Sequence, residues 1–66
     1  MQITLNGQNF ELTAPFTLSA LLDTLGMTGK PVVVEHNQLA LLPKELATVT
    51  LSEGDVIEII QITAGG

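Results

Sequence analysis

The chain begins with the sequence MQITLNGQNFEL (residues 1–12), in which apolar and polar side chains alternate on both sides of an Asn-Gly pair. Alternation with a period of two is typical of a β-strand that buries one face. Asn6 and Gly7 tolerate the positive φ angles of a two-residue hairpin turn. This turn places Ile3 opposite Phe10, so the apolar side chains of the two strands share one face. The stretch therefore predicts a β-hairpin.

A short helix is expected at residues 18–25, where leucines at positions i, i+3, i+4 and i+7 form one apolar stripe. Thr17 is a suitable N-cap, because its hydroxyl can accept a hydrogen bond from a free backbone N–H. Gly26 can adopt the left-handed conformation that ends many helices. Since so short a helix is marginal on its own, we expect it to pack against a sheet.

The most strongly β-prone stretch is the sequence VIEIIQI at residues 56–62. Glu58 sets the phase of this strand, because a carboxylate favours the solvent side. The isoleucines on either side of Glu58 then face the core, since successive side chains point to opposite faces. Ile60 and Ile62 share the outer face with Glu58.

Residues 32–36 predict another strand, in which alternate valines face the core and Val33 faces outward. Between these two strands, residues 39–42 are compatible with a short strand and Pro43 with the start of a helical turn. Residues 48–51 are compatible with a short edge element. The order along the chain is therefore hairpin, helix, strand, short elements and final strand.

This order predicts a small α+β domain, a mixed sheet of four to five strands packed on one short helix, with the first and last strands adjacent at the centre. We expect one domain at residues 1–62 and a flexible tail at residues 63–66. The arrangement resembles the β-grasp, or ubiquitin-like, fold.

The composition excludes several classes of function. The 66 residues carry a formal net charge of −5 with only two basic side chains, which argues against nucleic acids and anionic membranes as partners. Without cysteine, and with His36 as the one histidine, neither disulfides nor a cysteine- or histidine-rich zinc site can form. No catalytic or metal site is expected, and His36 is interpreted as a strand-end or turn residue. We expect a soluble, cytoplasmic monomer whose macromolecular partner presents a basic surface.

The sequence ends in Gly65 and Gly66, and this pair has two interpretations. It can be an uninformative terminus. Alternatively, a tail without side chains can thread a narrow channel and bring its carboxylate to a reactive centre. Such a carboxylate is anionic at neutral pH and a poor electrophile. It would therefore need activation, for instance by adenylylation with ATP, before a nucleophile could attack it.

Across its whole length the sequence resembles the ThiS family, the sulfur carrier proteins of thiamine biosynthesis. The resemblance rests on the short length, the Asn-Gly hairpin, the Thr17-Leu18 pair that opens a leucine-rich helix, and above all on Glu53-Gly54-Asp55 before the last strand and the terminal Ala64-Gly65-Gly66. Pro43-Lys44-Glu45 is similar to the family's Pro-Arg-Glu segment, with Lys44 in place of arginine.

The resemblance implies a carrier that is a co-substrate and not an enzyme. An E1-like adenylyltransferase of the ThiF type would use Mg-ATP to convert the Gly66 carboxylate into an acyl adenylate. Sulfur from a cysteine desulfurase would displace AMP and leave a thiocarboxylate on Gly66, while Gly65 and Ala64 thread the tail into the partner. Thiazole synthase of the ThiG type would then take the sulfur into the thiazole ring. The carrier would bind no cofactor, since its adenylyltransferase consumes the ATP and Mg.

A partner interface is expected on the outer face of the sheet, where Ile60, Ile62 and Val33 lie beside Glu58 and Glu35. Three alternatives to the thiamine sulfur carrier stay open. They are a sulfur carrier of molybdopterin synthesis (the MoaD type), a ubiquitin-like modifier that forms isopeptides on lysines, and a plain β-grasp interaction module with an inert tail. The intact mass after incubation with an adenylyltransferase, ATP and a sulfur donor would separate the carriers from the modifier and the module.

Overall fold

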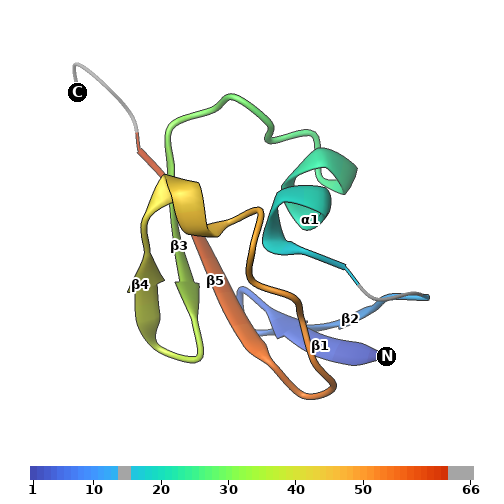
Figure 1. Ribbon diagram of the computed structural model, residues 1–66. Coiled ribbons are helices and arrows are strands. Elements are labelled where there is room, and N and C mark those ends of the chain that lie inside the picture. The colour runs from blue at the N-terminus through green and yellow to red at the C-terminus, as the bar shows by residue number, and fades with distance from the viewer. Residues whose placement is uncertain (14–15, 63–66) are drawn as a thin grey trace.

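The computed structural model describes residues 1–13 and 16–62, so the expected tail at residues 63–66 lies outside the described residues. Within these ranges five strands, one α-helix and one 3-10 turn follow each other along the chain (Figure 1). In chain order they are β1 (Gln2–Leu5), β2 (Gln8–Glu11), α1 (Leu18–Thr24), β3 (Val32–His36), β4 (Leu39–Leu41), η1 (Pro43–Glu45) and β5 (Val56–Gln61).

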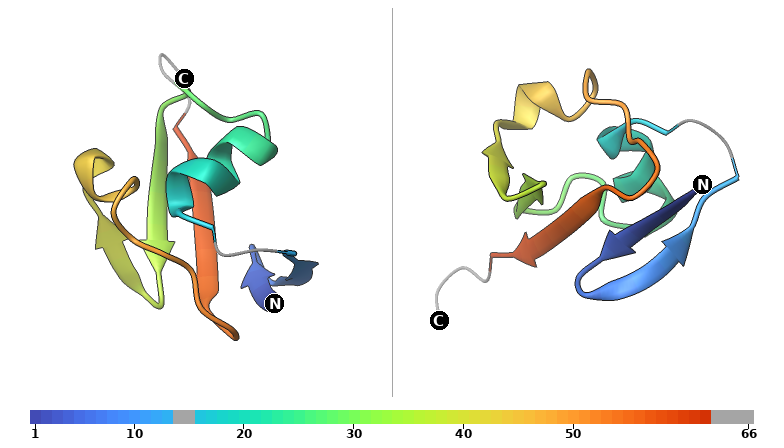
Figure 2. Two further views of the ribbon diagram at one scale, coloured as in Figure 1. Left: turned by 45° about the vertical axis from the view of Figure 1, so that its right-hand side comes forward. Right: turned by 90° about the horizontal axis from the view of Figure 1, so that it is seen from below.

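The strands form one mixed sheet in the order β2-β1-β5-β3-β4. The central strand β5 has β1 as a parallel neighbour on one side and β3 as an antiparallel neighbour on the other. α1 lies across one face of this sheet (Figure 2). The predicted α+β architecture, with the first and last strands adjacent at the centre, is therefore confirmed.

The predicted hairpin register is confirmed for β1 and β2, where Ile3 lies opposite Phe10. Asn6 and Gly7 form the turn with φ angles of 49° and 82°. The Asn6 side chain also makes a tertiary contact, since its Oδ1 accepts the Ile59 N–H at 2.8 Å. The turn is therefore held against the central strand β5.

Local signals fix both ends of α1. Thr17 Oγ1 accepts the Ala20 N–H at 3.2 Å, as expected of an N-cap. Gly26 follows the helix with a φ of 73°, in the left-handed conformation predicted for it. The face of α1 that packs on the sheet consists of the buried side chains Leu18, Leu21 and Leu22.

Nine of the described apolar side chains make up the core between α1 and the sheet. They are Ile3, Leu12, Leu18, Leu21, Leu22, Val34, Leu51, Ile57 and Ile59. The phase predicted for the last strand is confirmed, because Ile57 is 0% and Ile59 is 7% exposed. Ile60 and Ile62, in contrast, are 51% and 50% exposed.

Residues 48–51 do not form the edge element that the sequence suggests. They lie beside the segment that precedes α1, where the Leu51 N–H donates to the Phe16 carbonyl at 2.8 Å. A single isolated bridge, between Thr17 and Thr50, is the only β pairing here among the described residues. The Leu51 side chain is also buried in the core, so backbone hydrogen bonds and burial together hold this stretch in place.

Candidate docking face

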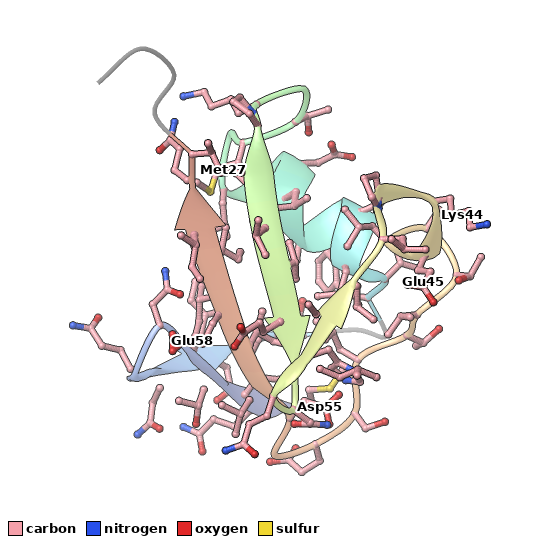
Figure 3. All side chains as sticks on the ribbon, turned by 90° about the vertical axis from the view of Figure 1, so that its left-hand side faces the viewer. Met27, Lys44, Glu45, Asp55 and Glu58 are labelled. Carbon is pink, nitrogen blue, oxygen red and sulfur yellow. The ribbon has the colours of Figure 1, made fainter. Side chains whose placement is uncertain are left out.

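The face of the sheet opposite α1 carries the side chains that the sequence singles out as a partner interface. Figure 3 looks onto this face, with Glu58 midway along β5. In the antiparallel pairing of β3 and β5, Val33 lies directly opposite Ile60, and Glu35 lies directly opposite Glu58. Paired residues point to the same side of a sheet, so an aliphatic pair and an acidic pair are neighbours on this face.

Apolar side chains continue along β5 on both sides of Glu58. Val56, Ile60 and Ile62 are 42%, 51% and 50% exposed, whereas Val33 on the neighbouring strand is half-buried. Ile62 comes directly after β5, and its N–H donates to the Pro31 carbonyl at 2.9 Å. The face is therefore an aliphatic stripe on the central strand, interrupted by a pair of carboxylates.

The predicted tail residues Ala64, Gly65 and Gly66 lie outside the described residues. In the sequence, however, only Thr63 separates them from Ile62, and Gly66 is four positions after Ile62. Four fully extended residues span at most about 14 Å. A partner that binds this face would therefore have the end of the chain within reach.

A polar cluster that sequence reasoning missed surrounds Asp55, at the end of β5 farther from Ile62 (Figure 3). Asp55 Oδ2 lies 2.8 Å from His36 Nε2 and accepts the Ser52 N–H at 2.8 Å. Asp55 Oδ1 accepts a hydrogen bond from Asn37 Nδ2 at 3.1 Å. Partial burial raises the pKa of Asp55, but these hydrogen bonds, above all the one to His36, outweigh it and lower the pKa below its ordinary value.

The whole Glu53-Gly54-Asp55 segment holds the turn before β5 in place. Glu53 Oε1 accepts the Gln2 N–H at 3.0 Å, which ties the turn to β1. Gly54 has a φ of 83°, a conformation that costs little only for glycine. The sequence does show a turn at this position, but it does not show that His36 is the partner of Asp55.

The Pro43-Lys44-Glu45 segment forms the 3-10 turn η1. Glu45 Oε1 accepts the Leu42 N–H at 2.7 Å, and the proline has the fixed φ that suits the first position of such a turn. The Lys44 side chain is exposed and takes no part in these hydrogen bonds. The hydrogen bonds of this turn therefore do not depend on the side chain at position 44.

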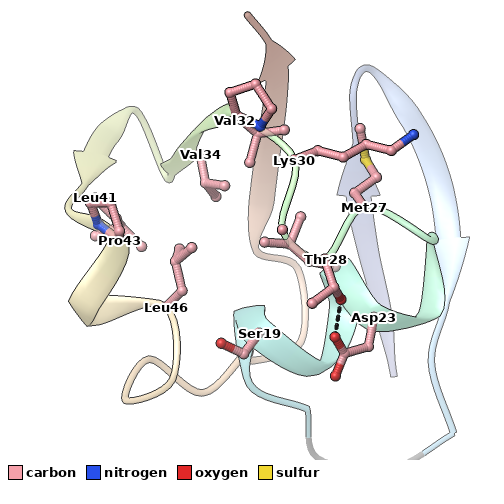
Figure 4. Close-up of a pocket in the computed structure, with 13 residues that line it drawn as sticks. Ser19, Asp23, Met27, Thr28, Lys30, Val32, Val34, Leu41, Pro43 and Leu46 are labelled. Atoms are coloured by element: carbon pink, nitrogen blue, oxygen red, sulfur yellow. Dashed lines mark hydrogen bonds between the residues drawn. The ribbon is translucent and has the colours of Figure 1, made fainter.

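A groove of about 340 Å³ lies on the helix side of the sheet, between α1, β3 and η1 (Figure 4). Asp23 accepts a hydrogen bond from Thr28 Oγ1 at one rim, and Lys30 lies nearby. The lining contains one carboxylate, one lysine and no histidine. Its residues are Ser19, Leu22, Asp23, Met27, Thr28, Gly29, Lys30, Pro31, Val32, Val34, Leu41, Pro43 and Leu46, none of them selected from the sequence as an interface residue.

Residues 1–13 and 16–62 contain no group of three or more histidine, cysteine or carboxylate side chains placed to hold a metal ion. Their one α-helix is also too short to cross a membrane.

The sequence is also similar to a known protein family. The model of the ThiS family matches residues 3–66. This chain belongs to the ThiS family. The Glu53-Gly54-Asp55 and Ala64-Gly65-Gly66 segments, on which the resemblance rested, both lie within the matched region.

Curated relatives cover this ThiS-family chain completely. It is 37% identical over 67 residues to a thiazole synthase of Paramagnetospirillum magneticum and 36% identical over 66 residues to a thiazole synthase of Magnetococcus marinus. The chain spans only 20% of the length of each of these two proteins. It is also 37% identical over 67 residues to the uncharacterized protein ycf40 of Pyropia yezoensis, of which it covers 93%.

Solved structures of a ThiS protein have the same fold. The crystal structure of the thiamine biosynthesis protein ThiS from Geobacter metallireducens matches with a TM-score of 0.85 and 26% identity, with both chains fully covered. Its solution structure matches with a TM-score of 0.81, also at 26% identity, and covers all of this chain and 88% of the other. The β-grasp fold expected from the sequence is confirmed.

Proposed function

We propose that this chain is a sulfur carrier of thiamine biosynthesis and that it carries sulfur as a thiocarboxylate on Gly66. The observation that supports this most directly is the match of the ThiS family model, which runs from residue 3 through Gly66 and so includes the Gly-Gly end. On this proposal the chain is a co-substrate, and the catalytic groups belong to its partners.

The proposed cycle begins with activation, because a carboxylate is a poor electrophile. A ThiF-type adenylyltransferase joins the Gly66 carboxylate to the AMP portion of Mg-ATP and releases pyrophosphate. The terminal sulfur of a cysteine desulfurase persulfide then attacks the adenylate and displaces AMP, which leaves an acyl disulfide. A thiol reductant cleaves its S–S bond to give the Gly66 thiocarboxylate, and thiazole synthase takes up the sulfur. Gly65 and Ala64 carry little or no side chain, which lets the tail enter a narrow site. We place this cycle in the cytoplasm, where ATP is available.

The link to thiazole synthase is supported by the curated relatives. In two organisms a region similar to this entire chain makes up 20% of a protein named thiazole synthase. Sharing one polypeptide gives two domains a high effective concentration for each other. We therefore propose a ThiG-type thiazole synthase as the acceptor that receives sulfur from this carrier.

The outer face of β3 and β5 is the proposed docking site for these partners. Ile60 and Ile62 are half-exposed aliphatic side chains on a central strand, and Val33 and Glu58 adjoin them. Exposed aliphatic side chains that gather on one face mark an interaction surface more strongly than isolated ones do. Binding here would leave the end of the chain free to reach a partner's reactive centre.

The intact mass of the carrier tests the proposal. After incubation with a ThiF-type adenylyltransferase, Mg-ATP, cysteine desulfurase, cysteine and a thiol reductant, we expect the exchange of one oxygen for sulfur. Deletion of Gly66 should abolish this exchange and leave the melting temperature unchanged, because all residues of the core cluster lie at or before Ile59. A wild-type mass that stays unchanged would contradict the proposal.

Other products of the same experiment would favour the alternative functions. Covalent conjugates with lysines of other proteins would indicate a ubiquitin-like modifier. A thiocarboxylate that serves molybdopterin synthase but not thiazole synthase would indicate a carrier of the MoaD type.

A further inference from the structure

Five of the seven carboxylate side chains accept a hydrogen bond from the chain's own groups. The donors are the amino group of Met1 for Glu11, Thr28 for Asp23, the Leu42 N–H for Glu45, the Gln2 N–H for Glu53, and the Ser52 N–H and Asn37 amide for Asp55. Glu35 and Glu58 accept none from the described residues. The two carboxylates that lack a hydrogen-bond donor within residues 1–13 and 16–62 are thus the pair at the middle of the proposed docking face.

The position of this pair is unfavourable in the free protein. Glu35 and Glu58 lie directly opposite each other on β3 and β5, and like charges in directly opposed positions of a sheet destabilise it. The two ion pairs among the described residues involve Met1 with Glu11 and His36 with Asp55, so no cation of the fold reaches them. Residues 14–15 and 63–66 add no basic side chain. A cation that neutralises the pair must therefore come from another molecule.

The neighbours of the pair indicate which cation fits. Val33 and Ile60 form the adjacent cross-strand pair on the same face, and Val56 lies on the other side of Glu58. An arginine side chain matches this surface, because its guanidinium can bind carboxylates with several N–H donors while its methylene stem covers aliphatic groups. A small hydrated cation would gain nothing from the aliphatic neighbours.

We propose that Glu35 and Glu58 together bind one arginine side chain on a basic surface of the ThiF-type adenylyltransferase. Aliphatic side chains next to that arginine would cover Val33 and Ile60. This inference rests on the function proposed above. The net charge of −5 supports a basic partner through complementary fields. A second copy of this chain is disfavoured, because it would place one acidic pair against another.

The test measures stability and binding on the same variants. Glu35→Gln, Glu58→Gln and the double variant keep the side-chain volume and remove the charge, and Asp23→Asn on α1 is the control that removes one charge from the helix side. By calorimetry with the ThiF-type adenylyltransferase, each glutamate variant should bind about tenfold more weakly than the wild type. The double variant should lose less than the product of the single losses, because both carboxylates act on one cation. The melting temperature of each glutamate variant should be unchanged or higher.

The outcomes separate this inference from the proposed function. If the glutamate variants bind as tightly as the wild type, or if Asp23→Asn weakens binding as much as they do, the arginine site is wrong. If the glutamate variants still acquire the thiocarboxylate in that case, the proposed carrier function stands and only the arginine site is rejected. A wild type that neither binds the adenylyltransferase nor changes mass would overturn both.

Discussion

Asp55 accepts more hydrogen bonds than any other carboxylate among the described residues. Its partners are Ser52 in the same turn and His36 and Asn37 at the end of β3, 19 and 18 positions away in the sequence. Asn37 adds a further bond, since its Oδ1 accepts the Val56 N–H at 2.8 Å. Asp55 therefore joins the turn before β5 to the turn after β3. This structural role accounts for an aspartate at this position, and no contact with a partner protein is needed to explain it.

Substitution of Asp55 by asparagine should lower the free energy of unfolding by about 1–3 kcal/mol. One accepting oxygen would become an amide donor and could no longer serve the donors around it. Urea denaturation of both proteins measures the difference. Asp23→Asn is the control, because Asp23 is exposed and accepts a single hydrogen bond, from Thr28. Equal losses from the two substitutions would contradict the assigned role of Asp55.

The same comparison should depend on pH. The folded protein lowers the pKa of Asp55, so it binds the proton less readily than the unfolded chain does. The contribution of Asp55 is thus complete above the unfolded pKa of about 4 and is lost as the pH falls through the lower folded pKa. The gap between wild type and Asp55→Asn should be largest at neutral pH and should shrink in acid.

At the scale of the element, β5 both completes the core and forms the outer face. Ile57 and Ile59 are buried beneath α1, and the alternating positions Glu58 and Ile60 face away from it. Because the side-chain period of a strand is two, a slip of one residue would exchange these roles completely. The phase of this single strand therefore decides which of its side chains are buried and which are exposed on the outer face.

Two aspartate substitutions on opposite faces of β5 test which face is buried and which is exposed. Ile57→Asp should prevent stable folding, because it buries an unpaired charge in the core. Ile60→Asp should leave the fold intact, as shown by circular dichroism and the melting temperature, but weaken binding to the adenylyltransferase. If Ile60→Asp unfolded the protein, the phase of β5 would be wrong. Unchanged binding would instead remove Ile60 from the interface.

At the scale of the whole molecule, the net charge of −5 affects how fast this chain associates with a charged partner. Opposite charge on a partner speeds association at long range, and salt screens this effect. Raising the salt concentration from about 0.05 M to about 0.5 M should therefore slow association with the adenylyltransferase several-fold in stopped-flow measurements. The melting temperature of this chain alone should not fall over this range, because screening relieves its internal charge repulsion. An association rate that does not depend on salt would contradict a basic partner surface.

The sequence by itself determined the local structure of this protein and much of its candidate interface. The Asn6-Gly7 turn, the Thr17 cap and the alternation around Glu58 are properties of neighbouring residues, so each could be predicted from the sequence and was confirmed. For the same reason Ile60 and Ile62 could be placed on the outer face before the sheet order was known. The tail chemistry came from family resemblance and lies beyond the described residues.

Only the tertiary structure decided which distant residues meet. The register between β3 and β5 puts Glu35 opposite Glu58, and the approach of two turns puts His36 beside Asp55. The segment at residues 48–51 packs beside the start of α1, where its own pattern suggested an edge element. Each of these contacts depends on how separate elements pack into one core, and no local pattern of side chains encodes that arrangement.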